Sequence, residues 1–154
     1  MPLLHAGSLS LDSLVAGFAL APLLSRASEW IAASVLFGAA DGLASLVATH
    51  VVVAPGMVAL YGAYVFAVVV VAMMFAASGD RRSLWAVIVA VAVALSVDNL
   101  LSPTAPAPAG VASVVLALLG FVVGARLAGG LRSRLRIAWI GTGLLAAVYL
   151  SLAT

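Results

Sequence analysis

Six long apolar segments, separated by short connectors that contain most of the charges, make up nearly the whole chain. They lie near residues 3–24, 30–50, 56–77, 84–101, 110–127 and 137–152. A helix that crosses a lipid bilayer needs about 20 mostly apolar residues, whereas a membrane-spanning β-strand needs only about 10. The sequence therefore predicts an all-α, polytopic membrane protein with six transmembrane helices in one domain over residues 1–154.

The composition agrees with a membrane protein and excludes several other classes. Charged residues make up 8% of the chain, against about a quarter in soluble globular proteins. Asp12 interrupts the first segment and the first basic residue is Arg26, so we expect a retained helix, not a cleaved signal peptide. The net charge of +2 gives no basic patch for nucleic acid, and the absence of cysteine excludes disulfides and thiolate metal sites.

The arginines predict how the helices are oriented. They fall in or beside alternate connectors, the first, third and fifth: Arg26, Arg81, Arg82, Arg126, Arg132, Arg134 and Arg136. By the positive-inside rule these connectors are cytoplasmic, which puts both termini outside. Trp30, Trp85 and Trp139 lie near the same side, as an aromatic belt would, and the tyrosines near the other.

One short motif occurs twice, as "LSLDSL" at residues 9–14 and "LSVDNL" at residues 95–100. The two copies fall in the first and fourth segments, each the first helix of a three-helix half. Three helices reverse direction, so the halves would cross the membrane in opposite senses. The sequence predicts a 3+3 inverted repeat, about 1–79 and about 80–154, with a binding site near the midplane.

Only three acids lie within the six segments: Asp12, Asp41 and Asp98. A charged carboxylate at the membrane centre costs roughly 2.5 to 3.5 kcal/mol on insertion scales, and the segments hold no basic partner near it. A divalent cation would explain the acids, because hard cations prefer carboxylate, hydroxyl and amide oxygens. We therefore expect a metal site of these three acids, with neutral oxygens from Ser10, Ser13, Ser96 and Asn99. The alternative is that the aspartates are protonated or hydrogen-bonded between helices.

Glycines recur every four residues at Gly38 and Gly42 and again at Gly120 and Gly124. Such pairs let helix backbones approach closely, so helix packing is their expected role. His50 is expected at a membrane interface, and Glu29 at the surface.

Four stretches resemble one family in order along the chain: "SLSLDSLVAGFALA", "FGAADGLASLV", "ALSVDNLL" and "LLGFVVGARLAGGLRSRLRIAWIGTGLL". They are similar to the bacterial manganese efflux pumps, MntP, of the LysE transporter superfamily. The family's serine-hydrophobic-aspartate motif is matched at Ser10 to Asp12 and at Ser96 to Asp98, and its F-G motif at Phe37, Gly38 and Asp41. The chain departs from the family where Ser13 and Asn99 replace the alanine that usually follows each motif aspartate.

This resemblance implies a multi-pass protein of the bacterial plasma (inner) membrane that exports a divalent cation, manganese first, by alternating access with proton coupling. Mn²⁺ would be the substrate and no cofactor is expected, because no bond is made or broken and the protein is not an enzyme. Expected partners are the cation and membrane lipid, with no nucleic acid, and so small a bundle could form a homodimer. The alternatives are export of another solute, such as an amino acid, and a membrane scaffold that transports nothing.

Overall fold

The computed structural model describes residues 11–50, 60, 61, 64, 65, 67, 68, 71, 80–101, 106–129 and 133–153. Of these, the side chains of residues 98, 101, 106, 133, 134, 137 and 148–153 are not described. The elements are α2 (Leu11–Leu20), the 3₁₀ turn η1 (Ala21–Leu23), α3 (Ala27–Ala48), α5 (Arg81–Leu95), α6 (Asp98–Leu101), α7 (Pro106–Ala128) and α8 (Ser133–Ala153). The described residues contain no strand, which confirms the predicted all-α class.

Two helices in the described part of the chain are long and apolar enough to cross a membrane, namely α3 and residues Ala107–Ala128 of α7. Shorter apolar helices run over Leu11–Leu23 and Ala138–Ala147. The third expected span, 56–77, falls largely outside the described residues, although those described between 60 and 71 have helical backbone. The count of six spans and the 3+3 repeat remain predictions.

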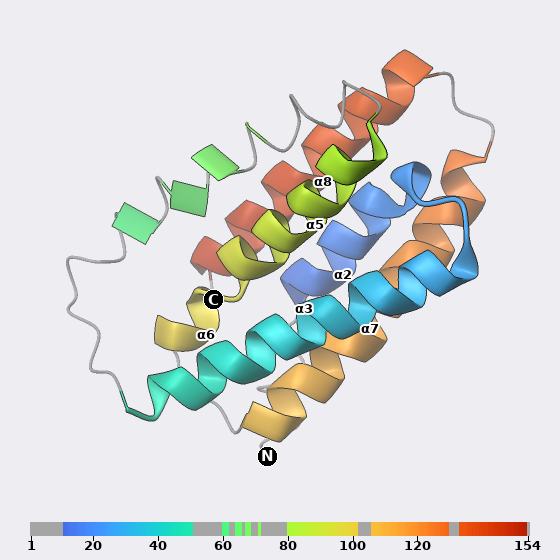
Figure 1. The fold of residues 1–154 in the computed structure, drawn as a ribbon. Helices are drawn as coiled ribbons and strands as arrows, with labels where there is room; N and C mark the ends of the chain where they lie inside the picture. The colour runs from blue at the N-terminus through green and yellow to red at the C-terminus, as the bar shows by residue number, and fades with distance from the viewer. Residues whose placement is uncertain are drawn as a thin grey trace.

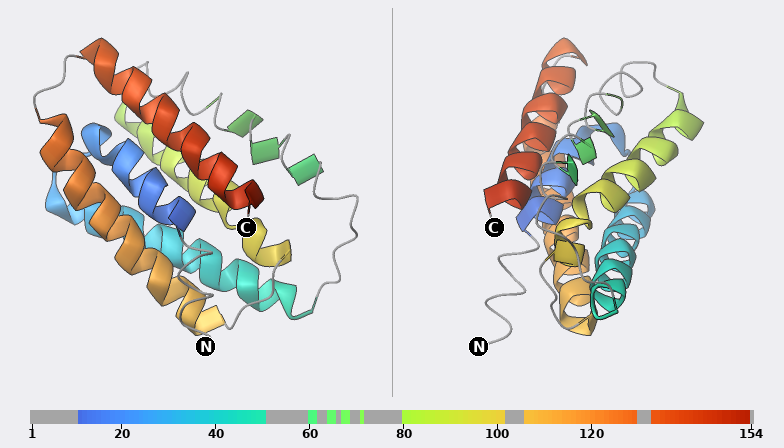
Figure 2. Two further views of the ribbon diagram at one scale, coloured as in Figure 1. Left: turned by 180° about the vertical axis from the view of Figure 1, so that it is seen from behind. Right: turned by 90° about the vertical axis from the view of Figure 1, so that its left-hand side faces the viewer.

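Helix α2 lies in the middle of the bundle and contacts α7, α8 and α5, while α7 also packs along α3 (Figure 1). Seen from behind and from the side, the helices form one elongated bundle (Figure 2). Its core is apolar and includes the large buried side chains Leu20, Phe37, Ile88, Phe121 and Ile140.

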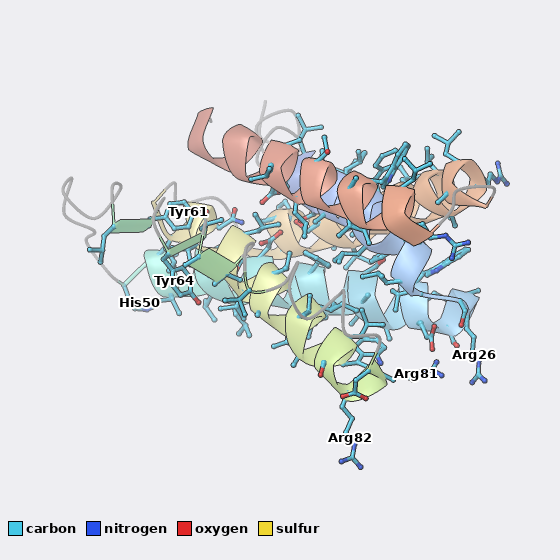
Figure 3. The ribbon with its side chains drawn as sticks, turned by 90° about the horizontal axis from the view of Figure 1, so that it is seen from above. Arg26, His50, Tyr61, Tyr64, Arg81 and Arg82 are labelled. Atoms are coloured by element: carbon cyan, nitrogen blue, oxygen red, sulfur yellow. The ribbon has the colours of Figure 1, made fainter. Side chains whose placement is uncertain are left out.

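The two ends of the bundle differ in their side chains. Arg26, Arg81 and Arg82 lie at one end, and His50, Tyr61 and Tyr64 at the opposite end (Figure 3). Helices α3, α5 and α8 begin at the arginine end and α7 finishes there (Figures 1 and 2). The labelled arginines thus lie together at one end of the bundle, as their spacing along the chain predicts.

The surface of the bundle carries apolar side chains even next to the buried polar residues. On α7, large apolar side chains four residues apart are between 47% and 65% exposed: Val111, Val115, Leu119, Val123 and Leu127. Ser113 on the opposite face of the same helix is fully buried. An apolar stripe of this length facing outward is expected where the surroundings are lipid hydrocarbon and not water.

The segment predicted as one helix over 84–101 is broken. Helix α5 ends at Leu95, Ser96 and Val97 form a turn, and α6 begins at Asp98. The Ser96 hydroxyl donates to the carbonyl of Val93 at 3.0 Å, and the Asn99 and Leu100 N–H groups bond three residues back, to Ser96 and Val97. A serine hydroxyl competes for backbone groups in this way, and here the regular helix ends at Ser96, inside the motif.

The connector "SPTAPAPA" contains three prolines, which predict an extended, stiff turn and not a helix, but it is helical from Pro106 onward. Prolines at 106 and 108 fall in the first turn of α7, where the missing N–H groups would have no helical partner. The prediction that this whole segment is extended was therefore wrong for its second half.

Close helix contacts occur at the predicted glycine pairs, which confirms their packing role. A Cβ at Gly110 of α7 would lie 2.8 Å from the Gly38 carbonyl oxygen of α3. A Cβ at Gly120 would lie 2.8 Å from the Phe18 nitrogen and closer still to the Leu14 carbonyl oxygen, both on α2. Only glycine lets these backbones approach so closely.

Gly120→Ala should lower stability by about 1–3 kcal/mol, because the new methyl group would push α7 away from α2. Gly129→Ala is the matched control, since a Cβ there meets its nearest atom at 3.7 Å. Thermal unfolding of the purified protein in detergent measures both. Equal melting temperatures for the two variants would contradict the close contact.

At the arginine end, Glu29 and Asp80 hold the starts of two helices. Glu29 accepts the backbone N–H groups of Ser25 at 3.0 Å and Arg26 at 3.1 Å, and pairs with Arg81 of α5. Its side chain is 11% exposed, so Glu29 is a partly buried residue at the surface that is held by these contacts. Asp80 accepts from the Ser83 N–H at 3.3 Å and the Ser83 hydroxyl at 3.0 Å, which caps α5.

Hydrogen bonds from the Ser83 hydroxyl and backbone hold the pKa of Asp80 below its ordinary value of 3.8. A lowered folded-state pKa means that the cap contributes stability above pH 3.8 and loses it as the pH falls through the folded pKa. Asp80→Ala should therefore lower the melting temperature at pH 7, and lower it by a smaller amount below the folded-state pKa of Asp80. Asp80→Asn should keep most of the cap at both pH values. Melting curves across pH 2.5–7 test this; a pH-independent difference between Asp80→Ala and the parent protein would contradict it.

Candidate functional site

The carboxylate of Asp41 is the centre of a buried polar cluster. Asp41 lies in the middle of α3 and is 1% exposed. Its Oδ2 accepts hydrogen bonds from the Ser13 hydroxyl of α2 at 3.3 Å and from the Ser113 hydroxyl of α7 at a short distance. The side chain of Asn99 of α6 also hydrogen-bonds this carboxylate. Groups from three other helices thus meet at one acid.

Asp12 lies beside this cluster, in the first turn of α2, and is 2% exposed. Its Oδ1 accepts the backbone N–H of Ser13 at 2.6 Å, while the Ser13 hydroxyl donates to Asp41. Ser13 therefore connects the two acids through adjacent bonds.

Asp41 receives hydrogen bonds only from neutral groups among the interactions described, two hydroxyls and one amide. Such groups orient a carboxylate and share its hydrogen-bonding capacity, but they do not cancel its charge. In this setting the negative charge of a carboxylate must be balanced by a bound cation or removed by a proton.

The other predicted site residues have different places. Asn99 is buried and belongs to the Asp41 cluster. Ser96 is buried, but its hydroxyl hydrogen is used by the Val93 carbonyl. The backbone of Asp98 begins α6 while its side chain falls outside the described residues, and Ser10 falls outside them altogether. Within the part that the structure describes, no three acids or histidines lie together.

Ser113 was not predicted as part of the site. It is the one polar residue between Gly110 and Arg126, in an otherwise apolar helix, and that isolation is the signal that could have identified it. Ser34 and Ser45 are also single hydroxyls within apolar stretches of the sequence, and both are buried on α3 with Asp41. A single hydroxyl in a long apolar segment is therefore a candidate hydrogen-bond donor to a buried acid on a neighbouring helix.

Comparison of the chain with protein-family models, with curated proteins and with solved structures finds no match.

Ser113→Ala should destabilise the protein by about 1–3 kcal/mol, because the buried Asp41 carboxylate loses a donor that nothing replaces. Ser34→Ala is the matched control: it removes a buried hydroxyl with no hydrogen-bond partner among the described residues, so stability should not fall. Chemical or thermal unfolding in detergent compares them. A loss in Ser34→Ala as large as that in Ser113→Ala would contradict the assigned hydrogen bond.

Proposed function

We propose that the protein exports a divalent metal cation, Mn²⁺ first among these ions, across a bacterial inner membrane. The observation that carries this proposal is the Asp41 carboxylate, fully buried in a helix long enough to span a membrane and surrounded by neutral oxygen-bearing groups from α2, α6 and α7. A group so unfavourable in an apolar interior is expected to serve a function.

The donor set favours a hard cation. Asp41 and Asp12 supply carboxylate oxygens, Ser13, Ser113 and Asn99 supply neutral oxygens, and Asp98 is the third expected acid. Oxygen-only sites of this kind suit Mg²⁺, Ca²⁺ and Mn²⁺ better than zinc or copper, which favour nitrogen and sulfur. The resemblance to the manganese efflux pumps selects Mn²⁺ among these ions.

Alternating access follows from where the ligands come from. In the proposed 3+3 arrangement α2 and α3 belong to the first half, and α6 and α7 to the second. The Asp41 cluster would then lie between the halves, where their relative movement alters the coordination of the ion. The break between α5 and α6 within the repeated motif agrees with the discontinuous helices found at such sites.

Proton coupling follows from charge balance. When the cation leaves, neighbouring carboxylates would repel one another in an apolar site, and a proton on one of them relieves this. The arginine end would face the cytoplasm under the positive-inside rule, with both termini outside. An exporter of amino acids is less well supported, because the donors to Asp41 offer no basic group for a substrate carboxylate.

Mn²⁺ flux into proteoliposomes tests the proposal, with Asp41→Asn as the principal variant. Losing an outer-shell partner of a metal costs about 10–100-fold, so losing a direct ligand should reduce flux at least about 100-fold. Asp80→Asn is the control, an aspartate at the arginine end that is fully exposed. Both proteins should insert and elute as the parent does.

Two results would overturn the export function. One is flux of Mn²⁺, Mg²⁺, Zn²⁺ and Cd²⁺ no faster than in empty vesicles. The other is Asp41→Asn transporting like the parent protein. Loss of assembly in Asp41→Asn, with no flux in the parent, would favour the scaffold alternative instead.

A further inference from the structure

A polar seam runs along the buried face of α3. Ser34, Asp41 and Ser45 are spaced seven and four residues apart, which places them on one side of a helix. All three are buried, whereas Ile31, Val35 and Leu43 of the same helix are large, apolar and exposed. Between residues 31 and 46 the helix is therefore apolar on the outside, and its polar side chains Ser34, Asp41 and Ser45 are on the inside.

Ser34 differs from the other buried serines in the described helices. Its oxygen is buried and has no hydrogen-bond partner among the described residues, and its side chain is 1% exposed. A serine or threonine in a helix usually satisfies itself by donating to a carbonyl one turn back, as Thr142 does to Ala138 at 2.9 Å. A buried, unsatisfied hydroxyl is unfavourable for stability, so we looked for a ligand that it could meet during transport.

The position of Ser34 suggests that ligand. It lies two helical turns, about 10 Å, from Asp41 toward the arginine end. Among the buried polar side chains that the structure describes, Ser34 alone lies between the Asp41 cluster and the arginine end. The other core residues there are apolar, for example Phe37 and Leu20. A cation that moves between Asp41 and the arginine end along α3 would find no other buried side-chain oxygen there among the described residues.

We propose that Ser34 supplies a transient oxygen ligand to the transported divalent cation on the arginine side of Asp41. The inference rests on the proposed export function and adds a second position to the same path. A neutral oxygen suits a transient stop, because an ion must bind well enough to enter and weakly enough to leave. The acids hold the ion, and Ser34 lowers the barrier for the step between the acids and the arginine end.

The test compares Ser34→Ala, Ser34→Thr and the control Ser28→Ala, an exposed serine on the same helix. Each is reconstituted in phosphatidylethanolamine and phosphatidylglycerol vesicles, and Mn²⁺ flux is followed by quenching of trapped calcein. Ser34→Ala should transport about tenfold more slowly, the effect of losing one polar interaction on the path. Ser34→Thr keeps the hydroxyl and should restore the flux, and Ser28→Ala should leave it unchanged.

Two further readouts separate this role from a structural one. Equilibrium Mn²⁺ binding, measured by electron paramagnetic resonance, should change by less than about twofold in Ser34→Ala, because Asp41 is distant enough for independent behaviour. The melting temperature should stay level or rise, since an unsatisfied hydroxyl is removed and alanine favours the helix. Slower flux in a more stable protein with intact binding is the result we expect.

The proposal fails if Ser34→Ala transports like the parent while Asp41→Asn does not, which would leave the export function standing. It also fails if Ser34→Thr is as slow as Ser34→Ala, because the hydroxyl would then be irrelevant. If Asp41→Asn transports normally as well, the export function itself is wrong. Flux measurements on one set of vesicles distinguish these three outcomes.

Discussion

The burial of the Asp41 carboxylate is the constraint on which the rest of the bundle depends. A carboxylate in an apolar interior is tolerated only if its oxygens are hydrogen-bonded and its charge is met by a cation or a proton. The donors that reach it come from α2, α6 and α7, so three other elements must approach α3 at that level. The glycine contacts make the approach possible, because Gly38 and Gly110 bring α3 and α7 together next to the bond from Ser113 to Asp41.

The distribution of polarity around Asp41 also differs from that of a water-soluble bundle. In a water-soluble helix bundle the serines and the aspartate would lie outside and the valines and leucines inside. Here Val111, Val115 and Leu119 face outward while Ser113 faces Asp41. If lipid hydrocarbon covers the outside, burying apolar side chains gains little, and helix association depends on close backbone packing and polar contacts between helices. Both occur where α7 packs on α2 and α3.

The sequence predicts most of the described helices, because apolar length and charge placement are direct physical requirements of a membrane-spanning chain. Helices α3, α7 and α8 overlap their predicted segments, and Asn99 of the repeated motif hydrogen-bonds Asp41, while the metal site itself stays a prediction. The break after Leu95 was missed because it depends on local competition by Ser96 for backbone groups, which apolarity does not report. Ser113 was missed because its role comes from the packing of α7 on α3, and hydroxyls are common in membrane helices.

The residue that follows each motif aspartate gives the repeated sequence a physical meaning. Ser13 follows Asp12 and Asn99 follows Asp98, and both of these following side chains reach the same Asp41 carboxylate. Where the resemblance leads one to expect alanine at both positions, this chain has a hydroxyl and an amide, each able to donate to Asp41 or to turn its oxygen toward a cation. Two motif copies that contact one acid are what an inverted repeat would produce.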